Sequence, residues 1–416
     1  LTRLVAPDAF GWMFVATSIG VTVSLICDAG FREVVVRSER GQDRAFLDTV
    51  WSLQVMRGVL LMTVALLIAG GLWLAERQGY RVGGVYDDPR FPVILAVLSI
   101  SFMIQGLQST RLWLAYRRMD TRAIVRIELT VQLVSLATIF GWAAFDASVW
   151  AMVAGSISSS VVGVILSHWA LPGTSDRFRI EPDATREVLR FGRWIWLSSI
   201  ITVLSTQFDK LFFGAIAAPT WIGQLSLAIG LVSALEAVIA RVASTIALPY
   251  FADYMRVDRV AATRRFAQAL IAVDCFAFLV AGGLYVTGPL IVDLLYPDSY
   301  ADAGRKLSVV GAVLLMTRTY VSGNFLLALD RGAMTVLASI AKTVALVGCV
   351  TGGYALQGAE GALLGVAAHA VVFYAVTVCI DISSGARLRL LNLLPFAALV
   401  AGAAVGQAVV LVASLL

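Results

Sequence analysis

The sequence predicts an all-α polytopic membrane protein built from two pseudo-symmetric six-helix bundles. Apolar residues make up 59% of the 416 residues, and the mean hydropathy is +0.85, both above the values of soluble globular proteins. Long apolar stretches alternate with loops that are rich in arginine and loops that are almost free of it. A helix needs about 20 mostly apolar residues to cross hydrocarbon, because its backbone must satisfy its own hydrogen bonds there. The pattern therefore indicates many helical membrane spans.

Twelve apolar stretches are long enough to be spans, and polar or turn-forming residues separate each of them from the next. Five precede a long polar interruption at 171–190, and seven follow it. In chain order, the expected spans are 10–29, 46–74, 92–114, 122–145, 148–170, 192–215, 220–242, 265–288, 304–328, 333–355, 360–381 and 391–416.

The distribution of positive charge predicts which loops face the cytoplasm. Of the 32 Lys and Arg residues, 22 lie in alternate loops, namely 30–45, 111–126, 177–193, 241–265, Arg331 and 387–389. Positive charge resists translocation, so these loops are expected on the cytoplasmic side. The net charge of +5 therefore reports membrane topology, and nucleic acid is not expected as a partner.

A short internal repeat relates the two halves of the chain. Residues 6–11 and 218–223 share Ala, Pro and Gly at equivalent positions. In the second half this turn follows the 192–215 span, so a matching helix is expected before Leu1 and is missing from the sequence. Two six-helix bundles related in this way form a parallel-repeat transporter design. The expected domains are an N-terminal lobe at 1–172 with five of six helices, a cytoplasmic linker at 173–191, a C-terminal lobe of six helices at 192–382, and an extra transmembrane helix at 383–416.

The sequence contains no pattern typical of a metal site, a nucleotide site or a disulfide scaffold. The four cysteines are far apart, and His168 and His369 lie singly in separate spans. No GxxxxGK[ST] phosphate loop occurs. No cofactor and no metal are therefore expected.

Several short segments carry a family resemblance. In order, they are Leu4–Gly11, Asp28-Ala29-Gly30, Leu53-Gln54-Val55-Met56-Arg57-Gly58, Phe191-Gly192 with Ser198-Ser199, Asp209 and Gly214, and Leu295-Tyr296 with Tyr300-Ala301. They are similar to an "LLGPEDFG"-type segment, a D-x-G, an L-Q-x-x-R-G, the opening helix of a second lobe and a periplasmic turn. The chain thus resembles the bacterial polysaccharide-lipid flippases of the multidrug/oligosaccharidyl-lipid/polysaccharide exporter superfamily.

The resemblance implies a transporter and not an enzyme. It implies that undecaprenyl-diphosphate-linked oligosaccharide repeat units are flipped from the cytoplasmic to the periplasmic leaflet, for O-antigen, capsule or exopolysaccharide assembly. The implied mechanism is alternating access around a central cavity between two lobes, driven by an ion gradient of H+ or Na+. The implied location is the bacterial inner (cytoplasmic) membrane. The implied partners are the polyprenyl-diphosphate-linked oligosaccharide, membrane lipids and the polysaccharide polymerase machinery.

Four cations inside the spans are the candidate substrate-binding residues, because ionisable groups in hydrocarbon are rare and costly. They are Arg57, Arg318, Lys342 and Lys210. At a rise of about 1.5 Å per residue, Arg57 and Arg318 lie near the membrane midplane. A guanidinium binds phosphate through two parallel hydrogen bonds, which suits a diphosphate. The structural alternative is that each cation pairs with a carboxylate or carbonyl in a helix contact, and that Lys210 extends to the membrane surface.

Two carboxylates are candidates for ion coupling. A buried carboxylate can bind and release a proton as a cavity changes sides. Asp274 is the deepest one without a nearby cation on its own helix, and Asp209 is the second candidate.

Other functions share parts of this pattern. A cation-coupled multidrug exporter of the same superfamily is the first alternative, and the four intramembrane cations weigh against it. A membrane-embedded glycosyltransferase or polymerase is the second, but the expected periplasmic loops at 75–91 and 289–303 are too short to house a catalytic site. A structural subunit without transport activity fits neither the repeat nor the buried charges. Flipping of a peptidoglycan precursor is a related task for the same kind of cavity.

Overall fold

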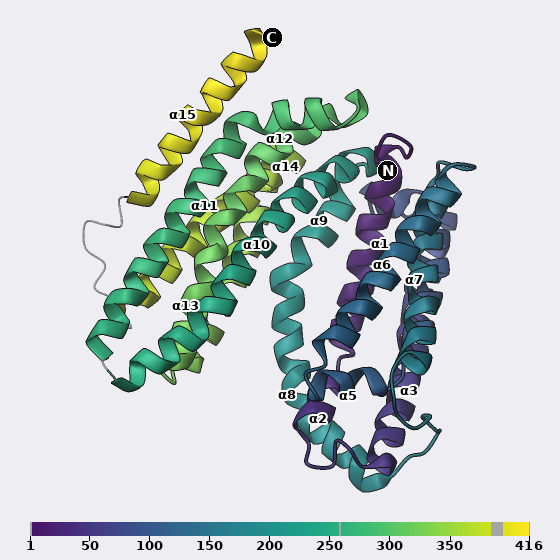
Figure 1. Ribbon diagram of the computed structural model, residues 1–416. Coiled ribbons are helices and arrows are strands. Elements are labelled where there is room, and N and C mark those ends of the chain that lie inside the picture. The colour runs from purple at the N-terminus through teal and green to yellow at the C-terminus, as the bar shows by residue number, and fades with distance from the viewer. Residues whose placement is uncertain (1, 258, 384–393, 416) are drawn as a thin grey trace. The chain divides into compact units, whose positions relative to one another are not determined.

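The computed structural model describes residues 2–257, 259–383 and 394–415, and all regular structure in these ranges is helical (Figure 1). The elements are α1 Pro7–Ile26, α2 Phe31–Arg37, α3 Arg44–Arg77, η1 Gly84–Asp87, α4 Phe91–Gly106, α5 Arg111–Arg117, α6 Thr121–Ala143, α7 Val149–Trp169, α8 Pro182–Thr206, α9 Phe208–Ile216, α10 Pro219–Val257, α11 Arg259–Leu295, η2 Asp298–Tyr300, α12 Ala301–Val310, η3 Gly311–Thr317, α13 Arg318–Ala328, α14 Gly332–Ser383 and α15 Leu394–Leu415. The chain divides into two compact units, Leu1–Ile222 and Gly223–Leu416.

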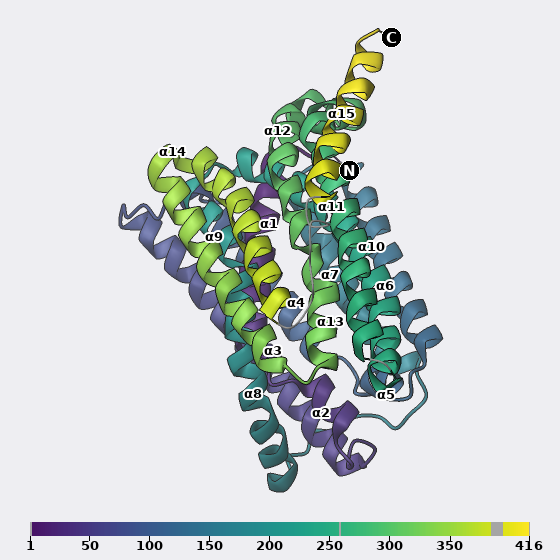
Figure 2. The same ribbon diagram turned by 90° about the vertical axis from the view of Figure 1, so that its left-hand side faces the viewer.

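The all-α polytopic fold class is confirmed. Among the described residues, nine helices are long and apolar enough to cross a membrane, and two bent helix pairs bring the number to eleven. The longest helix, α14, contains two predicted spans, because its backbone breaks at Gln357 and Gly358 (Figure 2). Gly358 has φ +64°, a conformation that glycine adopts readily. Part of the last predicted span, at 391–393, lies outside the described residues.

Three predicted spans differ in detail from the observed helices. The span at 92–114 consists of α4 and α5, bent by 64° around residues 107–110. The span at 304–328 contains a 3-10 segment, η3, between α12 and α13. The helix expected from 192 begins ten residues earlier, because Pro182 occupies its first turn, where the fixed φ of proline favours a helix start. The second half of the predicted linker is therefore helical.

In the first unit, α3 packs on α4 and α6 packs on α7. The α3–α4 contact is close at Gly58, where an added Cβ would lie 2.9 Å from the Gly106 Cα. Helices α8 and α9 also pack on α1 within this unit, although the sequence predicts them in the second lobe. The turn at Ala29 lies against Gly192 of α8, where an added Cβ would be 2.9 Å from the Ala29 carbonyl oxygen. The lobe boundaries at 172 and 192 stay a prediction.

In the second unit, α11 packs against both α12 and α15, and α13 and η3 pack against α14. The two arms of α14 approach each other at Gly353 and Gly361, where an added Cβ would lie 2.1 Å from a carbonyl oxygen of the other arm. Gly402 of α15 makes a similar approach to the Leu279 carbonyl oxygen of α11. Small residues thus set the closest helix contacts, as is usual in membranes.

The Gly58 contact leads to a stability prediction. Gly58→Ala is expected to destabilise the protein by about 1–3 kcal/mol, because the new methyl group overpacks the α3–α4 contact. The measurement is thermal unfolding of the purified protein in detergent. Gly70→Ala in the same helix is the control, because an added Cβ there meets nothing within 4 Å. Equal loss of stability in both variants would contradict the packing explanation.

Candidate functional site

A polar cavity of about 510 Å³ lies in the first unit. It is bordered by α1, α3 and α4, with α2 and α5 contributing residues at one end. Its polar lining includes Ser24, Asp28, Gln54, Arg57, Gln105 and Gln108. A cavity of this size, lined by amides, hydroxyls, two arginines and two carboxylates, is suited to a polar ligand.

Arg57 is a cation on the cavity wall, with a side chain that is 22% exposed. Its Nη2 donates to the carbonyl oxygen of Ser24 at 2.7 Å and to the Ser24 hydroxyl at 3.0 Å. The Asp28 carboxylate is 4.0 Å away, so it only partly compensates the charge. The Nε of Arg57 is buried and has no hydrogen-bond partner among the described residues. A buried donor without a partner is unusual. The side chain as a whole is partly exposed to the cavity, so the guanidinium can also bind an anion there.

Gln54, one turn before Arg57, closes the end of α4. Its Nε2 donates to the carbonyl oxygens of Gln105, Gly106 and Gln108 at 3.2, 3.0 and 3.2 Å. The last carbonyls of a helix have no partner within the helix, so this amide satisfies groups that would otherwise be buried without one. The L-Q-x-x-R-G segment thus supplies a helix cap at Gln54, a cavity cation at Arg57 and a close helix contact at Gly58.

The D-x-G segment shapes the other side of the cavity. The Asp28 carboxylate accepts a hydrogen bond from the Gly30 backbone N–H at 3.0 Å. Gly30 has φ +64°, and this left-handed residue begins α2. The turn brings Asp28 near Arg57 and places Phe31 on the cavity wall, with the Phe31 ring centroid 6.0 Å from the Arg57 guanidinium.

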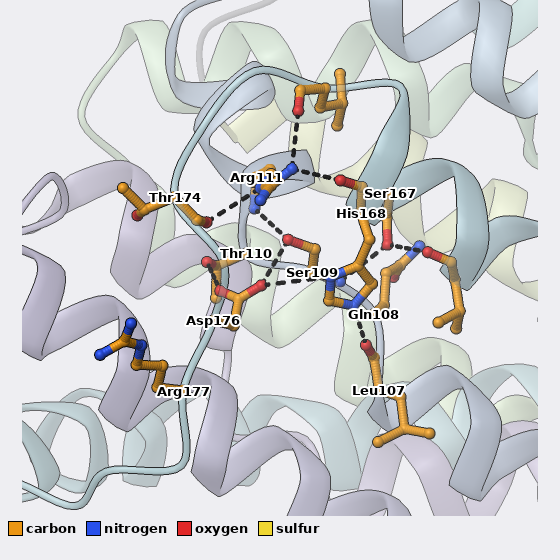
Figure 3. Close-up of polar contacts among 12 residues, drawn as sticks. Leu107, Gln108, Ser109, Thr110, Arg111, Ser167, His168, Thr174, Asp176 and Arg177 are labelled. Carbon is orange, nitrogen blue, oxygen red and sulfur yellow. Dashed lines mark hydrogen bonds and ion pairs between the residues drawn. The ribbon is translucent and has the colours of Figure 1, made fainter.

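The bend between α4 and α5 is fastened by the segment that follows α7 (Figure 3). The Asp176 carboxylate, 2% exposed, accepts hydrogen bonds from the Ser109 hydroxyl at 2.6 Å and from the Thr110 hydroxyl. Ser167 accepts from the Ser109 backbone N–H at 2.9 Å, and the His168 ring hydrogen-bonds the Leu107 carbonyl oxygen at 2.9 Å. These contacts hold the end of the cavity that Gln105 and Gln108 line.

Arg111 fastens the same segment from the other side of the bend (Figure 3). Its guanidinium donates to the carbonyl oxygens of His168, Leu171 and Thr174, the last two at 3.2 and 3.1 Å. A cation at the C-terminal end of α7 also offsets the negative end of the helix dipole. From the sequence, Arg111 was expected only as one of the positive charges of a cytoplasmic loop. Its structural role could not be predicted, because its partners lie 57 to 63 residues away in the chain.

A second polar cluster lies in the bundle of the second unit. Arg318 is 1% exposed and pairs with Asp274 and, through Nε at 2.9 Å, with Asp381. Asp274 accepts a further hydrogen bond from the Tyr374 hydroxyl at 3.2 Å, and Asp381 accepts one from the Ser322 hydroxyl. The cluster thus joins one guanidinium to two carboxylates.

The structure therefore brings together two of the predicted site residues, Arg318 and Asp274. Asp381 was missed, because it closes a predicted span and such a position suggests an interfacial charge. Arg57 lies in the first unit, in the 510 Å³ cavity, whereas Lys342 lines a separate hollow of about 230 Å³ in the second unit.

The remaining predicted residues, Asp209 and Lys210, lie half-buried in the first turn of α9 and do not line the 510 Å³ cavity. Lys306, near the start of the predicted span at 304–328, is buried and donates to the Gln224 side chain at 2.9 Å. Among the described residues, no group of three or more His, Cys, Asp or Glu is arranged to hold a metal ion. The substrate-binding and ion-coupling roles stay predictions.

Comparison with known proteins assigns the chain to a protein family. A family model described as polysaccharide biosynthesis protein matches residues 1–305. The chain belongs to this family of polysaccharide biosynthesis proteins. It is 21% identical over 369 residues to the lipopolysaccharide biosynthesis protein WzxC of Escherichia coli (strain K12), covering 88% of this chain and 72% of WzxC.

Two solved structures share the fold of this family member. One is an inward-facing multidrug resistance MATE family transporter of the MOP superfamily, with TM-score 0.63, 14% identity, and coverage of 94% of this chain and 92% of the other. The other is the lipid II flippase MurJ in an inward closed conformation, with TM-score 0.65, 11% identity, and coverage of 97% and 93%. At such identities the similarity establishes the two-lobe helical fold.

The family assignment confirms the resemblance seen in the short segments. The protein is a multi-pass, flippase-type transporter of polysaccharide biosynthesis, and its family and structural neighbours are transporters rather than enzymes. A membrane-embedded glycosyltransferase is therefore set aside.

The capping role of Gln54 leads to a second stability prediction. Gln54→Leu is expected to lower the free energy of unfolding by about 1–3 kcal/mol, because carbonyl groups at the end of α4 lose their donor in a buried place. Thermal unfolding in detergent is the measurement. Gln132→Leu, at an exposed position of α6, is the control and is expected to change stability by less than about 0.5 kcal/mol. A neutral Gln54→Leu would show that the cap contributes nothing.

Proposed function

We propose that this protein flips polyprenyl-diphosphate-linked oligosaccharide repeat units from the cytoplasmic to the periplasmic leaflet of the bacterial inner membrane. The observation that carries the proposal is Arg57, a guanidinium with a 22% exposed side chain on the wall of a polar cavity inside a membrane-spanning bundle. The names of the relatives support it: WzxC acts in lipopolysaccharide biosynthesis, and MurJ is a lipid II flippase.

The physical requirement of this cargo matches the cavity. A diphosphate cannot enter hydrocarbon unpaired, because burying an isolated charge costs several kcal/mol or more. Arg57 offers a charge-assisted contact for a phosphate, which is about twice as strong as a neutral hydrogen bond. Gln105 and Gln108, which line the same cavity, offer amide groups to sugar hydroxyls. The polyprenyl chain has no such need and can remain in the lipid.

Ion coupling is the second part of the proposal, and it rests on the Arg318 cluster. Two carboxylates facing one guanidinium leave an excess negative charge if both are ionised, and a buried excess charge is costly. Uptake of one proton by the Asp274–Asp381 pair removes that excess. We assign proton coupling to this pair, with Asp209 as the second candidate, and Lys342 and Lys210 as additional contacts for the cargo. The flipped repeat units would then serve the polysaccharide polymerase machinery.

The proposal is tested in the host organism. Deletion of the intact gene is expected to cause accumulation of one complete lipid-linked repeat unit on the cytoplasmic leaflet. Mass spectrometry identifies the lipid, and a membrane-impermeant glycan-modifying enzyme reports its leaflet. Wild type and Arg122→Ala, an exposed control position in α6, should reverse the accumulation, whereas Arg57→Ala should not.

An unchanged lipid pool, despite active synthesis of the glycan, would contradict flipping. That outcome would favour a multidrug exporter of the same fold. Accumulation of a peptidoglycan precursor would keep the flipping mechanism and change the cargo.

A further inference from the structure

A second hollow in the first unit is a groove of about 430 Å³ formed by α2, the end of α5 and the middle of α8. Two of its side chains are cationic, Arg32 and Arg37. Its apolar side chains include Val36, Phe191 and Ile195. Cationic and apolar side chains in one groove suit an amphiphile, a molecule with an anionic head and an apolar chain.

The groove is continuous in its lining with the 510 Å³ cavity. Arg32 and Glu33 belong to the walls of both hollows. They lie on α2, which begins at the left-handed Gly30 and directly follows Asp28 of the cavity. Arg32 and Glu33 therefore lie between the groove and the cavity that holds Arg57.

The two arginines of the groove differ in their interactions with neighbouring side chains. Arg32 donates to Glu33 at 2.8 and 3.0 Å, but its side chain is 58% exposed, so the pair is weak and open to exchange with another anion. Arg37 forms no ion pair within the described parts of the chain, and its guanidinium lies 6.0 Å from the Phe191 ring centroid. Both guanidinium groups are thus accessible to a phosphate, which they can bind through two hydrogen bonds.

The groove lies on the side of the membrane where the cargo starts. Its residues come from three segments, 30–45, 111–126 and 177–193 with the residues that follow it, and all three are arginine-rich loops expected in the cytoplasm. Exposed Val36 and the neighbouring apolar side chains can receive the first part of a lipid chain at this interface.

We propose that this groove is the access site for the diphosphate headgroup of the lipid-linked cargo. The headgroup contacts Arg37 first, exchanges with Glu33 at Arg32, and then reaches Arg57 in the cavity. The inference rests on the proposed flippase function and adds to it a route and two residues.

The test uses photo-crosslinking in the purified protein, reconstituted in phosphatidylcholine nanodiscs with undecaprenyl diphosphate as the probe. The photoreactive residue p-benzoylphenylalanine replaces Val36 in the groove or, separately, Val21 in the cavity, because both positions are exposed. Mass spectrometry measures the lipid adduct at each position over time. Phosphatidylglycerol at the same mole fraction is the competing anionic lipid.

We expect adducts with undecaprenyl diphosphate at both positions. Arg37→Gln should lower the adduct at Val36 roughly tenfold, as expected for loss of one charge-assisted contact, and should slow the adduct at Val21 without abolishing it. The remaining Val21 adduct shows that the variant is folded. Arg57→Gln should spare the Val36 adduct, and Arg186→Gln, a control whose side chain is 82% exposed and lies outside the groove, should change neither.

An adduct at Val21 without one at Val36 would overturn the access site and leave the flippase proposal intact. Equal adducts with phosphatidylglycerol would also overturn it, because the groove would then bind any anionic lipid. Absence of adducts at both positions would contradict the proposed function itself.

Discussion

Arg318→Ala is expected to destabilise the protein by about 3–5 kcal/mol, a large share of the stability of a typical domain. The substitution removes the guanidinium that pairs with both Asp274 and Asp381 and leaves two carboxylates in a buried site. Removing one partner of a buried ion pair is costly because the other charge stays buried without compensation. Thermal unfolding in detergent and the yield of folded protein are the measurements.

A triple variant separates charge from packing in this cluster. Arg318→Met combined with Asp274→Asn and Asp381→Asn removes all three charges at nearly constant volume. We expect it to recover most of the lost stability, since buried ion pairs can often be replaced by neutral groups at little cost. Arg305→Ala, at an exposed position of α12, is the matched arginine control and should be nearly neutral. If Arg318→Ala alone were as stable as the wild type, the cluster would contain no ionised pair.

The triple variant also tests ion coupling. If the Asp274–Asp381 pair takes up the coupled proton, the folded triple variant should lose gradient-driven transport while it still binds undecaprenyl diphosphate. Transport at the wild-type rate in a folded triple variant would move the coupling role to Asp209 or to another group.

Arg57→Gln is expected to lower the flipping rate roughly 10- to 100-fold without unfolding the protein. The variant loses a charge-assisted contact with a phosphate, worth about 1.5–3 kcal/mol. Its partners in the structure, the Ser24 carbonyl and hydroxyl, can be reached by an amide or by water, so the fold should survive. The measurement is the initial rate of flipping by protein reconstituted in proteoliposomes.

Arg57→Lys distinguishes simple charge from guanidinium geometry. Lysine keeps the positive charge but lacks the planar fork that binds phosphate through two bonds, so an intermediate rate is expected. Full activity of Arg57→Lys would indicate that the cavity needs only a cation. Full activity of Arg57→Gln would remove Arg57 from the mechanism.

The positions of the spans could be predicted from the sequence because the membrane imposes a length and an apolar composition on each helix. The breaks inside the spans could not be predicted in this way. The bend at 107–110 depends on Gln54 and Asp176, which contact it from 54 to 67 residues away. Likewise, η3 interrupts a uniformly apolar stretch, so composition gives no sign of it.

The candidate sites, too, could be predicted only in part from the sequence. Arg57 and Asp274 stood out because charges inside spans are costly and rare. Asp381, which pairs with Arg318, did not stand out, because this contact joins residues 63 positions apart on different helices. The sequence also grouped four cations as one set, whereas the structure distributes them over a polar cavity, an ion cluster, a smaller hollow and the start of α9.

Flipping by the purified protein is the measurement that bears most closely on the proposed function. Proteoliposomes containing the wild type, with an undecaprenyl-diphosphate-linked oligosaccharide and a proton gradient, should expose the glycan to an impermeant glycosidase faster than protein-free liposomes. Arg57→Gln should show roughly 10- to 100-fold slower exposure. Exposure at the protein-free rate by folded wild type, with either a proton or a sodium gradient, would contradict the flippase proposal.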